Sequence, residues 1–230
     1  MPWFIPQPGF LERLTEEEKI RMGTICPPRT YRRGEAIFRP GDPCQELVIV
    51  LDGTLKVSRL TERGQERILY LVGPGDILGA NFLDANAQYH AEAVCLNDEV
   101  RICPVNREQF IRVAKELPNV SLSLCGALAQ RLEHLEDQLE AATAPVAVRL
   151  GRVLVWLAQR FGKPAEAGWY RIESELRQED LAALAGTTRV TVTHTLSMLR
   201  QAGLVEGTRG TYHVRLEELE AYLEDLAWED

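Results

Sequence analysis

TTRVTVTHTLSMLR, residues 187–200, carries two hydrophobic periods at once, and the choice between them decides the fold of the C-terminal part of the chain. From Val190 to Thr195 apolar and hydroxyl-bearing residues alternate, as they do in a half-buried strand. Val192, Leu196 and Leu199 instead recur at the spacing of one helix face. The residues before this stretch favour the helix.

The segment QEDLAALAG, residues 178–186, predicts a first short helix that stops at Gly186. Thr187 or Thr188 can then cap a second helix, because a hydroxyl at that position accepts a backbone N–H of the first turn. The inward face of the second helix consists of Val192, Thr195, Leu196 and Leu199. Two short helices that meet at a tight glycine turn form a helix-turn-helix, whose second helix enters the major groove of DNA.

A hairpin is expected directly after these helices. GLVEGTRGTYHV, residues 203–214, predicts two short strands that turn between Gly207 and Gly210. The module is therefore predicted to be a winged helix-turn-helix.

The outward face of the second predicted helix carries side chains that can recognise DNA. Arg189 can donate two hydrogen bonds to guanine O6 and N7, and Val190 can contact a thymine methyl group. Thr188 and Arg177, at helix starts, can bind phosphates, and His194 can reach a base or a phosphate. Taken singly, each residue also fits a solvated or packed side chain, but together on one face they favour DNA contact. The predicted DNA-binding residues are Arg177, Thr188, Arg189, Val190, Thr191, Thr193 and His194.

The overall charge argues at first against a nucleic-acid partner. The 230-residue chain has a net charge of −8. Residues 217–230 hold seven acids and no base, whereas residues 177–215 hold five arginines against three acids. The acidity therefore lies largely in the tail, and the predicted DNA-binding segment is mildly basic.

The first half of the chain has a different residue pattern, with short apolar runs separated by glycine turns. Thr15 and Glu18 stand at capping-box spacing, which predicts a short helix. From Thr30 to Cys103, about eight short aliphatic and β-branched runs alternate with glycine turns, as in an antiparallel sandwich or barrel. Helical patterns follow Pro104.

A long helix is predicted from Pro118 to about Ala142, with apolar residues at alternating spacings of three and four. Such a seam favours a parallel homodimer, although the helix could instead be buried against its own barrel. The seam residues are Cys125, Leu128, Leu132, Leu135, Leu139 and Ala142.

These patterns predict an α+β chain with three parts. Residues 1–117 form an effector-sensing jelly roll with flanking helices, residues 118–143 form the dimerisation helix and hinge, and residues 144–230 form the winged helix-turn-helix domain with an acidic tail. No apolar run is long enough to span a bilayer, and we expect a cytoplasmic protein. The five cysteines show no C-x-x-C spacing, so we expect reduced thiols, with neither a disulfide framework nor a zinc site.

From about residue 10 to residue 215 the chain resembles the cyclic AMP receptor protein (Crp/Fnr) family of bacterial transcription regulators. YRRGEAIFRPGDPCQELVIVLDGTLKVSRL and LVGPGDILGAN resemble the family's cyclic-nucleotide-binding jelly roll, and the segment from Gln178 to Val205 resembles its DNA reader. The Arg-Val-Thr-Val-Thr run is closest to the cyanobacterial nitrogen-control branch, with His194 where arginine is usual. The resemblance implies a palindromic operator and contact with RNA polymerase.

The effector predicted from this resemblance is not cyclic AMP. Relatives that bind cyclic AMP hold it with a Gly-Glu pair and an Arg-Ser pair, but this chain has Gly79-Ala80, followed by Asn81, and no arginine in residues 85–93. A buried phosphate without a cationic partner is costly. The remaining candidate effector residues are Arg131 and Glu136, which match the helix positions that hold 2-oxoglutarate in the nitrogen-control branch.

Two interpretations of Arg131 and Glu136 remain open. The barrel arginine of a 2-oxoglutarate site is replaced near Ala87, and the two residues also occupy g and e positions of the seam, where an interhelical salt bridge explains them without a ligand. We therefore expect no required cofactor.

An enzyme is not expected. A metal-dependent jelly-roll enzyme needs several histidine ligands, and of His90, His134, His194 and His213 only His90 falls in the barrel region. We predict no catalytic residue and no metal site. The alternative to a transcription regulator is an effector-binding or scaffold dimer with a vestigial DNA-binding domain, against which Arg189 argues.

Overall fold

The computed structural model describes residues 9–173, 176–208 and 210–228. It divides into two compact units, with the border between His134 and Leu135. This border lies inside the long helix that the sequence predicts as the dimerisation segment. Each unit is described by itself.

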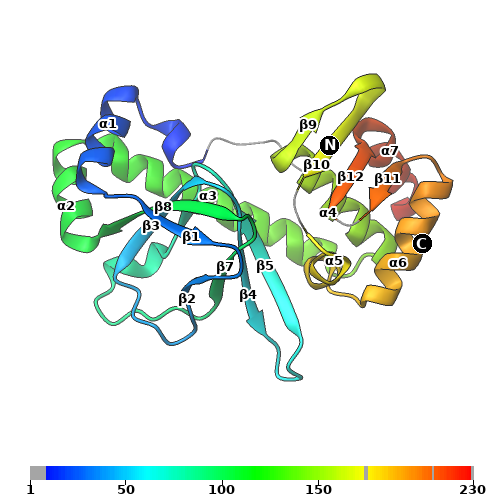
Figure 1. Cartoon of the computed structure of the whole chain (residues 1–230), viewed down its shortest axis with the longest axis horizontal. Helices are drawn as coiled ribbons and strands as arrows, with labels where there is room; N and C mark the ends of the chain where they lie inside the picture. The colour runs from blue at the N-terminus through cyan, green and yellow to red at the C-terminus, as the bar shows by residue number, and fades with distance from the viewer. Residues whose placement is uncertain (1–8, 174–175, 209, 229–230) are drawn as a thin grey trace. The chain divides into compact units, whose positions relative to one another are not determined.

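The N-terminal unit is built on eight strands in two four-stranded antiparallel sheets (Figure 1). One sheet has the order β1-β8-β3-β6 and the other the order β2-β7-β4-β5. The strands are β1 (Arg29–Arg32), β2 (Ala36–Phe38), β3 (Glu46–Asp52), β4 (Leu55–Leu60), β5 (Glu66–Val72), β6 (Ile77–Leu78), β7 (Glu92–Cys95) and β8 (Glu99–Asn106). This arrangement confirms the predicted antiparallel sandwich.

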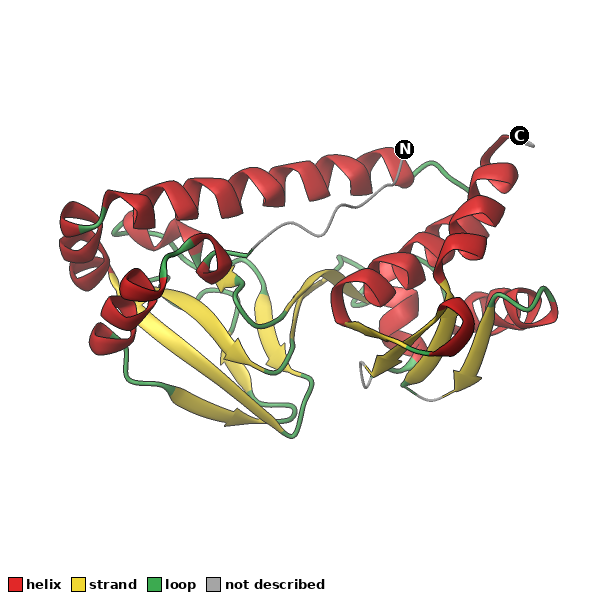
Figure 2. Ribbon diagram, turned by 90° about the horizontal axis from the view of Figure 1, so that it is seen from above, coloured by secondary structure: helices red, strands yellow, loops and turns green. Residues whose placement is uncertain are grey.

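Three helices accompany the sheets: α1 (Glu16–Ile25), α2 (Arg107–Glu116) and α3 (Pro118–Ala141). Figure 2 shows α3 as the longest helix of the chain. The predicted capping box at α1 is present, because Thr15 Oγ1 accepts the Glu18 N–H and the Glu18 carboxylate accepts the Thr15 N–H. Short 3-10 helices occupy Leu11–Arg13 (η1) and Ala80–Leu83 (η2).

Strand β3 explains why the run LVIVL, residues 47–51, is apolar throughout. Val48 and Val50 point into a core between the two sheets, together with residues such as Val57. Leu47 and Ile49 point the other way, into a second core closed by α1, α2 and the start of α3. Because successive strand residues face opposite sides, a strand buried on both faces is apolar at every position.

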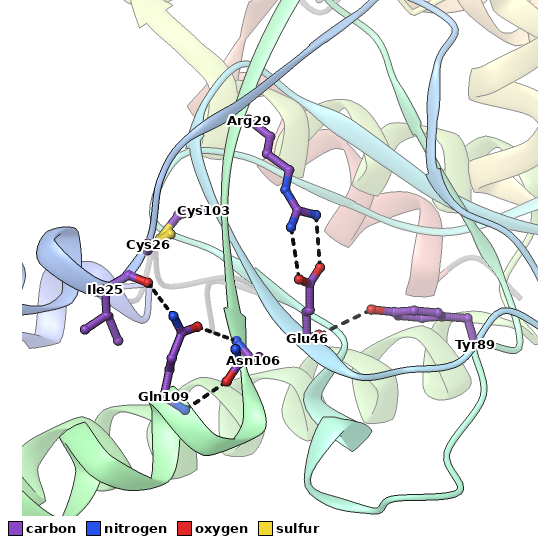
Figure 3. Close-up of polar contacts among 8 residues, drawn as sticks. All are labelled: Ile25, Cys26, Arg29, Glu46, Tyr89, Cys103, Asn106 and Gln109. Atoms are coloured by element: carbon purple, nitrogen blue, oxygen red, sulfur yellow. Dashed lines mark hydrogen bonds and ion pairs between the residues drawn. A yellow bond between two sulfur atoms is a disulfide. The ribbon is translucent and has the colours of Figure 1, made fainter.

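A disulfide joins Cys26, at the end of α1, to Cys103 of β8 (Figure 3). The expectation of reduced thiols is therefore wrong for these two cysteines. Their Cα atoms lie 5.5 Å apart although their sequence separation is 77, so no local spacing could reveal the pair. Beside them, Gln109 Nε2 donates to the Ile25 carbonyl at 3.1 Å and further fastens α1 to α2.

The C-terminal unit packs helices on one small sheet of order β11-β12-β10-β9. Its elements are α4 (Val146–Phe161), β9 (Gly162–Pro164), η3 (Glu166–Gly168), β10 (Trp169–Glu173), α5 (Gln178–Ala185), α6 (Arg189–Gln201), β11 (Val205–Thr208), β12 (Thr211–Arg215) and α7 (Leu216–Trp228). The buried stripe of α4 includes Leu150, Leu154 and Leu157. The predicted apolar face of this helix is thus confirmed as core.

Candidate nucleic-acid interface

The turn between α5 and α6 follows from two local signals. Gly186 ends α5 in the left-handed conformation, with φ +62°, which glycine adopts without steric cost. The Thr187 N–H then donates to the Ala182 carbonyl at 2.9 Å. Thr188 caps α6, because its Oγ1 accepts the Thr191 N–H at 3.2 Å. Residues 189–200 are therefore helical, and α5 and α6 form the predicted helix-turn-helix (Figure 1).

The inward face of α6 is the predicted one. Val192, Thr195, Leu196 and Leu199 are all buried, and they hold α6 against the rest of the unit. The alternation from Val190 to Thr195 arises because hydroxyl residues occupy both the exposed and the buried sides of this helix. Threonine can lie on the buried side because its methyl group packs while its hydroxyl can bond to the backbone of the preceding turn.

The outward face of α6 exposes the predicted DNA-binding side chains. The side chain of Arg189 is 68% exposed. Val190 is 78% exposed, although a valine is usually at least partly buried. Thr193 and His194 are exposed as well. The first two turns of the helix therefore present an arginine, an apolar side chain and polar groups to the outside.

Three of the predicted DNA-binding threonines already have partners within the protein. The hydroxyls of Thr188 and Thr191 lie 2.9 Å apart. The Thr193 hydroxyl lies 2.8 Å from Gln178 Oε1 and 3.0 Å from the Arg189 carbonyl. Their first role is to fix the start of α6, and DNA contact would be additional.

Arg189 makes an ion pair with a residue that the sequence does not single out. Its Nε lies 3.2 Å from Glu179 Oε1, and Glu179 belongs to the first turn of α5. Gln178, the neighbour of Glu179, contacts Thr193. Two side chains at the start of α5 thus reach the outer face of α6.

Arg177 stands at the N-cap of α5, as predicted. Its side chain is exposed, and its backbone N–H donates to Asp180 Oδ2 at 2.9 Å. The wing is also present, because β11 and β12 pair in register from Val205 with Val214 to Thr208 with Thr211. Arg200 Nη2 donates to the Gly207 carbonyl at 2.8 Å and holds this hairpin to α6. Arg209, at the tip, lies outside the described residues.

Arg149 of α4 ties the turn of the helix-turn-helix to the segment that follows α3. Its Nε donates to the Ala185 carbonyl at 3.0 Å and its Nη2 to the Gly186 carbonyl at 3.3 Å. Its Nη1 donates to the Ala144 carbonyl at 2.9 Å. One cation thus satisfies the carbonyls at the C-terminal end of α5 and in the segment between α3 and α4.

The predicted dimerisation seam of α3 is exposed in the single chain. Leu128 and Leu135 are each 41% exposed, Leu132 is 58% exposed and Leu139 is 75% exposed. Cys125 and Ala142 are exposed as well. The alternative in which this seam is buried against its own barrel does not hold for these leucines, although Val120 and Leu124 of the same helix are buried in the N-terminal core. A row of exposed leucines on one helix indicates a partner surface.

Gly79, one of the predicted effector residues of the jelly roll, lies beside a tyrosine. Gly79 has φ +73°, and a Cβ atom added there would meet the Glu46 carbonyl at 2.6 Å and the Tyr89 hydroxyl at 2.9 Å. Tyr89 stacks on Phe38 with centroids 3.7 Å apart, and its hydroxyl donates to the Glu46 carbonyl (Figure 3). Burial raises the pKa of Tyr89, so the ring stays neutral.

The rest of the predicted effector set is spread over several elements. Ala80 and Asn81 open η2, where Asn81 is exposed. Ala87, near the place of the barrel arginine that this chain lacks, packs against the N-terminal core. Glu136 is exposed on the part of α3 that belongs to the C-terminal unit. The described contacts thus show no shared polar cluster among these residues.

Arg131 lies with its guanidinium over the ring of Tyr70 in β5. The seam interpretation, in which Arg131 projects to a partner helix, is therefore replaced by a cation–π contact within the same chain. Burial lowers the pKa of Arg131 to about 10, and the Tyr70 and Asp76 charges oppose that shift. Burial, and next the Arg131 charge, lower the pKa of His134 to about 4, so His134 is neutral at pH 7.

The described residues form neither a cluster of metal ligands nor a helix suited to a membrane. No group of three or more His, Cys, Asp or Glu side chains among them is placed to hold a metal ion. Across the same ranges, no helix combines the length and the apolar character that crossing a membrane requires.

The chain holds an antiparallel jelly roll, a long helix with an exposed seam and a winged helix-turn-helix. These three parts together define a class of DNA-binding regulator. Comparison with known proteins agrees. Residues 28–116 match the cyclic nucleotide-binding domain family, and residues 148–222 match the Crp-like helix-turn-helix domain family.

Several relatives resemble the chain over most of its length. It is 33% identical over 201 residues to the cyclic AMP receptor protein of Thermus thermophilus, and the aligned region covers 87% of this chain and 88% of that protein. It is 32% identical over 197 residues to the global nitrogen regulator of Synechocystis sp., covering 82% and 86%. Among solved structures, a CooA variant from Carboxydothermus hydrogenoformans has the same fold, with a TM-score of 0.75 at 23% identity over 96% of this chain and 98% of that one. The chain belongs to the Crp/Fnr family of transcription regulators, and it is a sequence-specific DNA-binding regulator of that type.

Sequence reasoning missed Glu179, Gln178 and Arg149. The start of α5 carried one signal, an acid and an amide directly after Arg177, but only the turn at Gly186 brings them to α6. Arg149 has partners 36 and 37 residues away, which no periodicity predicts.

Proposed function

We propose that this regulator reads its operator through the first two turns of α6, with Arg189 contacting a guanine and Val190 a thymine methyl group. The observation that carries the proposal is the exposure of these two neighbours at the N-terminal end of a capped recognition helix. Val190 is 78% exposed, so its burial under another molecule would remove much apolar surface from water and would favour binding. His194 and Arg177 add contacts to a base or to phosphates.

The regulator acts as a cytoplasmic homodimer joined along α3, and its two α6 helices enter successive major grooves of a palindromic site, about 34 Å apart. The exposed leucines of the seam support this arrangement. RNA polymerase is the proposed protein partner at the promoter. The vestigial alternative has no observation in its favour, because the capped reader helix and its outward arginine are intact.

The proposed regulator does not respond to cyclic AMP and requires no cofactor. Support comes from Tyr89, whose ring and hydroxyl fill the space beside Gly79, and from Arg131, which already packs on Tyr70. A phosphate placed there would have to displace buried aromatic contacts without gaining a cation. 2-Oxoglutarate would have to draw Arg131 away from Tyr70. We expect neither compound to change the melting temperature or the DNA affinity of the protein.

The test of the reader is selection of bound duplexes from random DNA, followed by binding measurements on the selected site. Arg189→Ala is expected to lower the affinity by about 5- to 150-fold, which corresponds to about 1 to 3 kcal/mol, and to relax the preference at one base pair per half-site. Substituting Arg171, an exposed arginine on β10, by alanine is the matched control and should leave the selected motif unchanged. If Arg189→Ala binds the same motif with the same affinity, α6 does not read DNA through this residue.

A further inference from the structure

We propose that Glu179 is a positioning residue for base recognition: it holds the Arg189 guanidinium so that its two terminal nitrogens face the guanine. The inference rests on the proposed function of Arg189 and adds a second residue to the specificity of the reader. The two residues come from different helices, Glu179 from the first turn of α5 and Arg189 from the first turn of α6.

The contact geometry suits this role. The ion pair runs from Arg189 Nε to Glu179 Oε1, at 3.2 Å. A guanidinium has five N–H donors in a planar fork, and its Nε–H lies on the side of the fork. When a carboxylate accepts the Nε–H on that side, the N–H groups of Nη1 and Nη2 remain available at the end of the fork. These two nitrogens can donate to guanine O6 and N7 together.

The contact is not explained by folding stability. The two side chains are 68% and 57% exposed, and an ion pair between exposed groups contributes little to the stability of a fold. A carboxylate on a surface that faces DNA also repels phosphates and therefore weakens binding to every sequence. Glu179 therefore adds little to the stability of the fold and opposes DNA binding. Its presence is explained if it restricts the orientation of Arg189, which contacts the base.

The neighbouring contact has the same form. Gln178 Oε1 lies 2.8 Å from the hydroxyl of Thr193, which is one turn beyond Arg189 on α6. The start of α5 therefore supports the outer face of α6 at two successive positions. A long arginine loses much rotamer freedom when it binds, and fixing the side chain beforehand reduces that loss.

The test compares Glu179→Gln with Glu206→Gln. Glu206 is an exposed acid of β11 in the same winged module, and its substitution removes the same charge. Fluorescence anisotropy gives the Kd for the selected duplex, for duplexes with each other base at the guanine position, and for a duplex with 7-deazaguanine, which lacks the N7 acceptor. The full-length protein is used throughout, and thermal unfolding checks that each variant is folded.

Both substitutions are expected to strengthen binding to random DNA by a similar factor, since each removes one negative charge. Glu179→Gln is further expected to lower the preference for guanine by about three- to tenfold and to reduce the 7-deazaguanine penalty, because the guanidinium is no longer oriented. Glu206→Gln is expected to leave both quantities unchanged. In an Arg189→Ala background, Glu179→Gln should cause no further loss of guanine preference.

Equal guanine preference in Glu179→Gln and Glu206→Gln overturns the inference. So does a change of preference at a different base pair that persists in the Arg189→Ala background, because Glu179 would then contact a base itself. The proposed function fails separately, if Arg189→Ala alone keeps the preference for guanine. The two failures are thus distinguished in one set of measurements.

Discussion

Replacing Leu132 by alanine should weaken the dimer by more than tenfold. Leu132 lies at the centre of the exposed seam of α3 and is 58% exposed in the single chain. Full burial of a leucine side chain contributes about 1.5 to 3 kcal/mol, so covering the exposed part contributes about 0.9 to 1.7 kcal/mol per subunit. A symmetric dimer buries the residue twice. Since alanine keeps one methyl group, the expected loss is about 1.5 to 3 kcal/mol, or about 10- to 150-fold in the dimer Kd.

Sedimentation velocity over a concentration series measures this constant directly. The matched control is Ile20→Ala, which removes a side chain that is 69% exposed on α1, away from the seam. The control should leave the dimer Kd unchanged, while Leu132→Ala should also weaken binding to a full palindrome more than binding to a half-site. The reasoning is refuted if Leu132→Ala and the wild type dimerise with the same Kd, because the exposed leucines would then have no partner helix.

Three further perturbations follow from the structure. Folding lowers the pKa of His134 from 6.5 to about 4, so below pH 6.5 the unfolded chain binds a proton that the folded chain does not. Urea unfolding should therefore show a free energy of unfolding that falls by at most about 3 kcal/mol between pH 7 and pH 4. His134→Gln should make this dependence on pH weaker. Arg149→Met removes three hydrogen bonds to backbone carbonyls. Chemical denaturation should show that the free energy of unfolding of the C-terminal unit falls by about 2 to 4 kcal/mol. An unchanged unfolding transition would contradict the capping role of Arg149. The Cys26–Cys103 disulfide joins positions with a sequence separation of 77, and its reduction should lower the free energy of unfolding by about 2 to 4 kcal/mol. The melting temperature of the wild type should therefore fall when reductant is added. Cys103→Ser should abolish this response to reductant.

Features that depend on local sequence could be predicted. The capping box of Thr15 and Glu18, the stop at Gly186 and a cap at Thr187 or Thr188 each involve residues within a few positions of one another. The structure has all three, with the cap at Thr188. The fold class also followed from periodicity, because strand and helix patterns change sharply after Pro104. The helices and strands that carry the reader are fixed by such short-range signals.

Features that depend on contacts between distant segments could not be predicted. The heptad pattern placed Arg131 at the edge of the seam, but β5 offers the ring of Tyr70, and a buried guanidinium gains more from that ring than from an exposed partner charge. Cys26 and Cys103 likewise meet only after α1 packs on the sheet. Periodicity gives the face on which a residue lies, and it does not give the partner on the neighbouring element.

This difference explains why one sequence identifies the reader more readily than the effector. The reader is a single helix whose chemistry lies in successive residues, so Arg189 and Val190 can be proposed as base-contacting residues as soon as the helix and its buried face are known. The candidate effector residues Gly79 and Arg131 come from the end of β6 and from α3, and the bulky Tyr89, from the loop before β7, packs beside Gly79. Whether a ligand fits there depends on which side chains already pack in that space, and these are set by tertiary contacts. The same dependence places Glu179 beside Arg189, so specificity in this regulator begins with a tertiary contact between two helices whose individual positions are locally encoded.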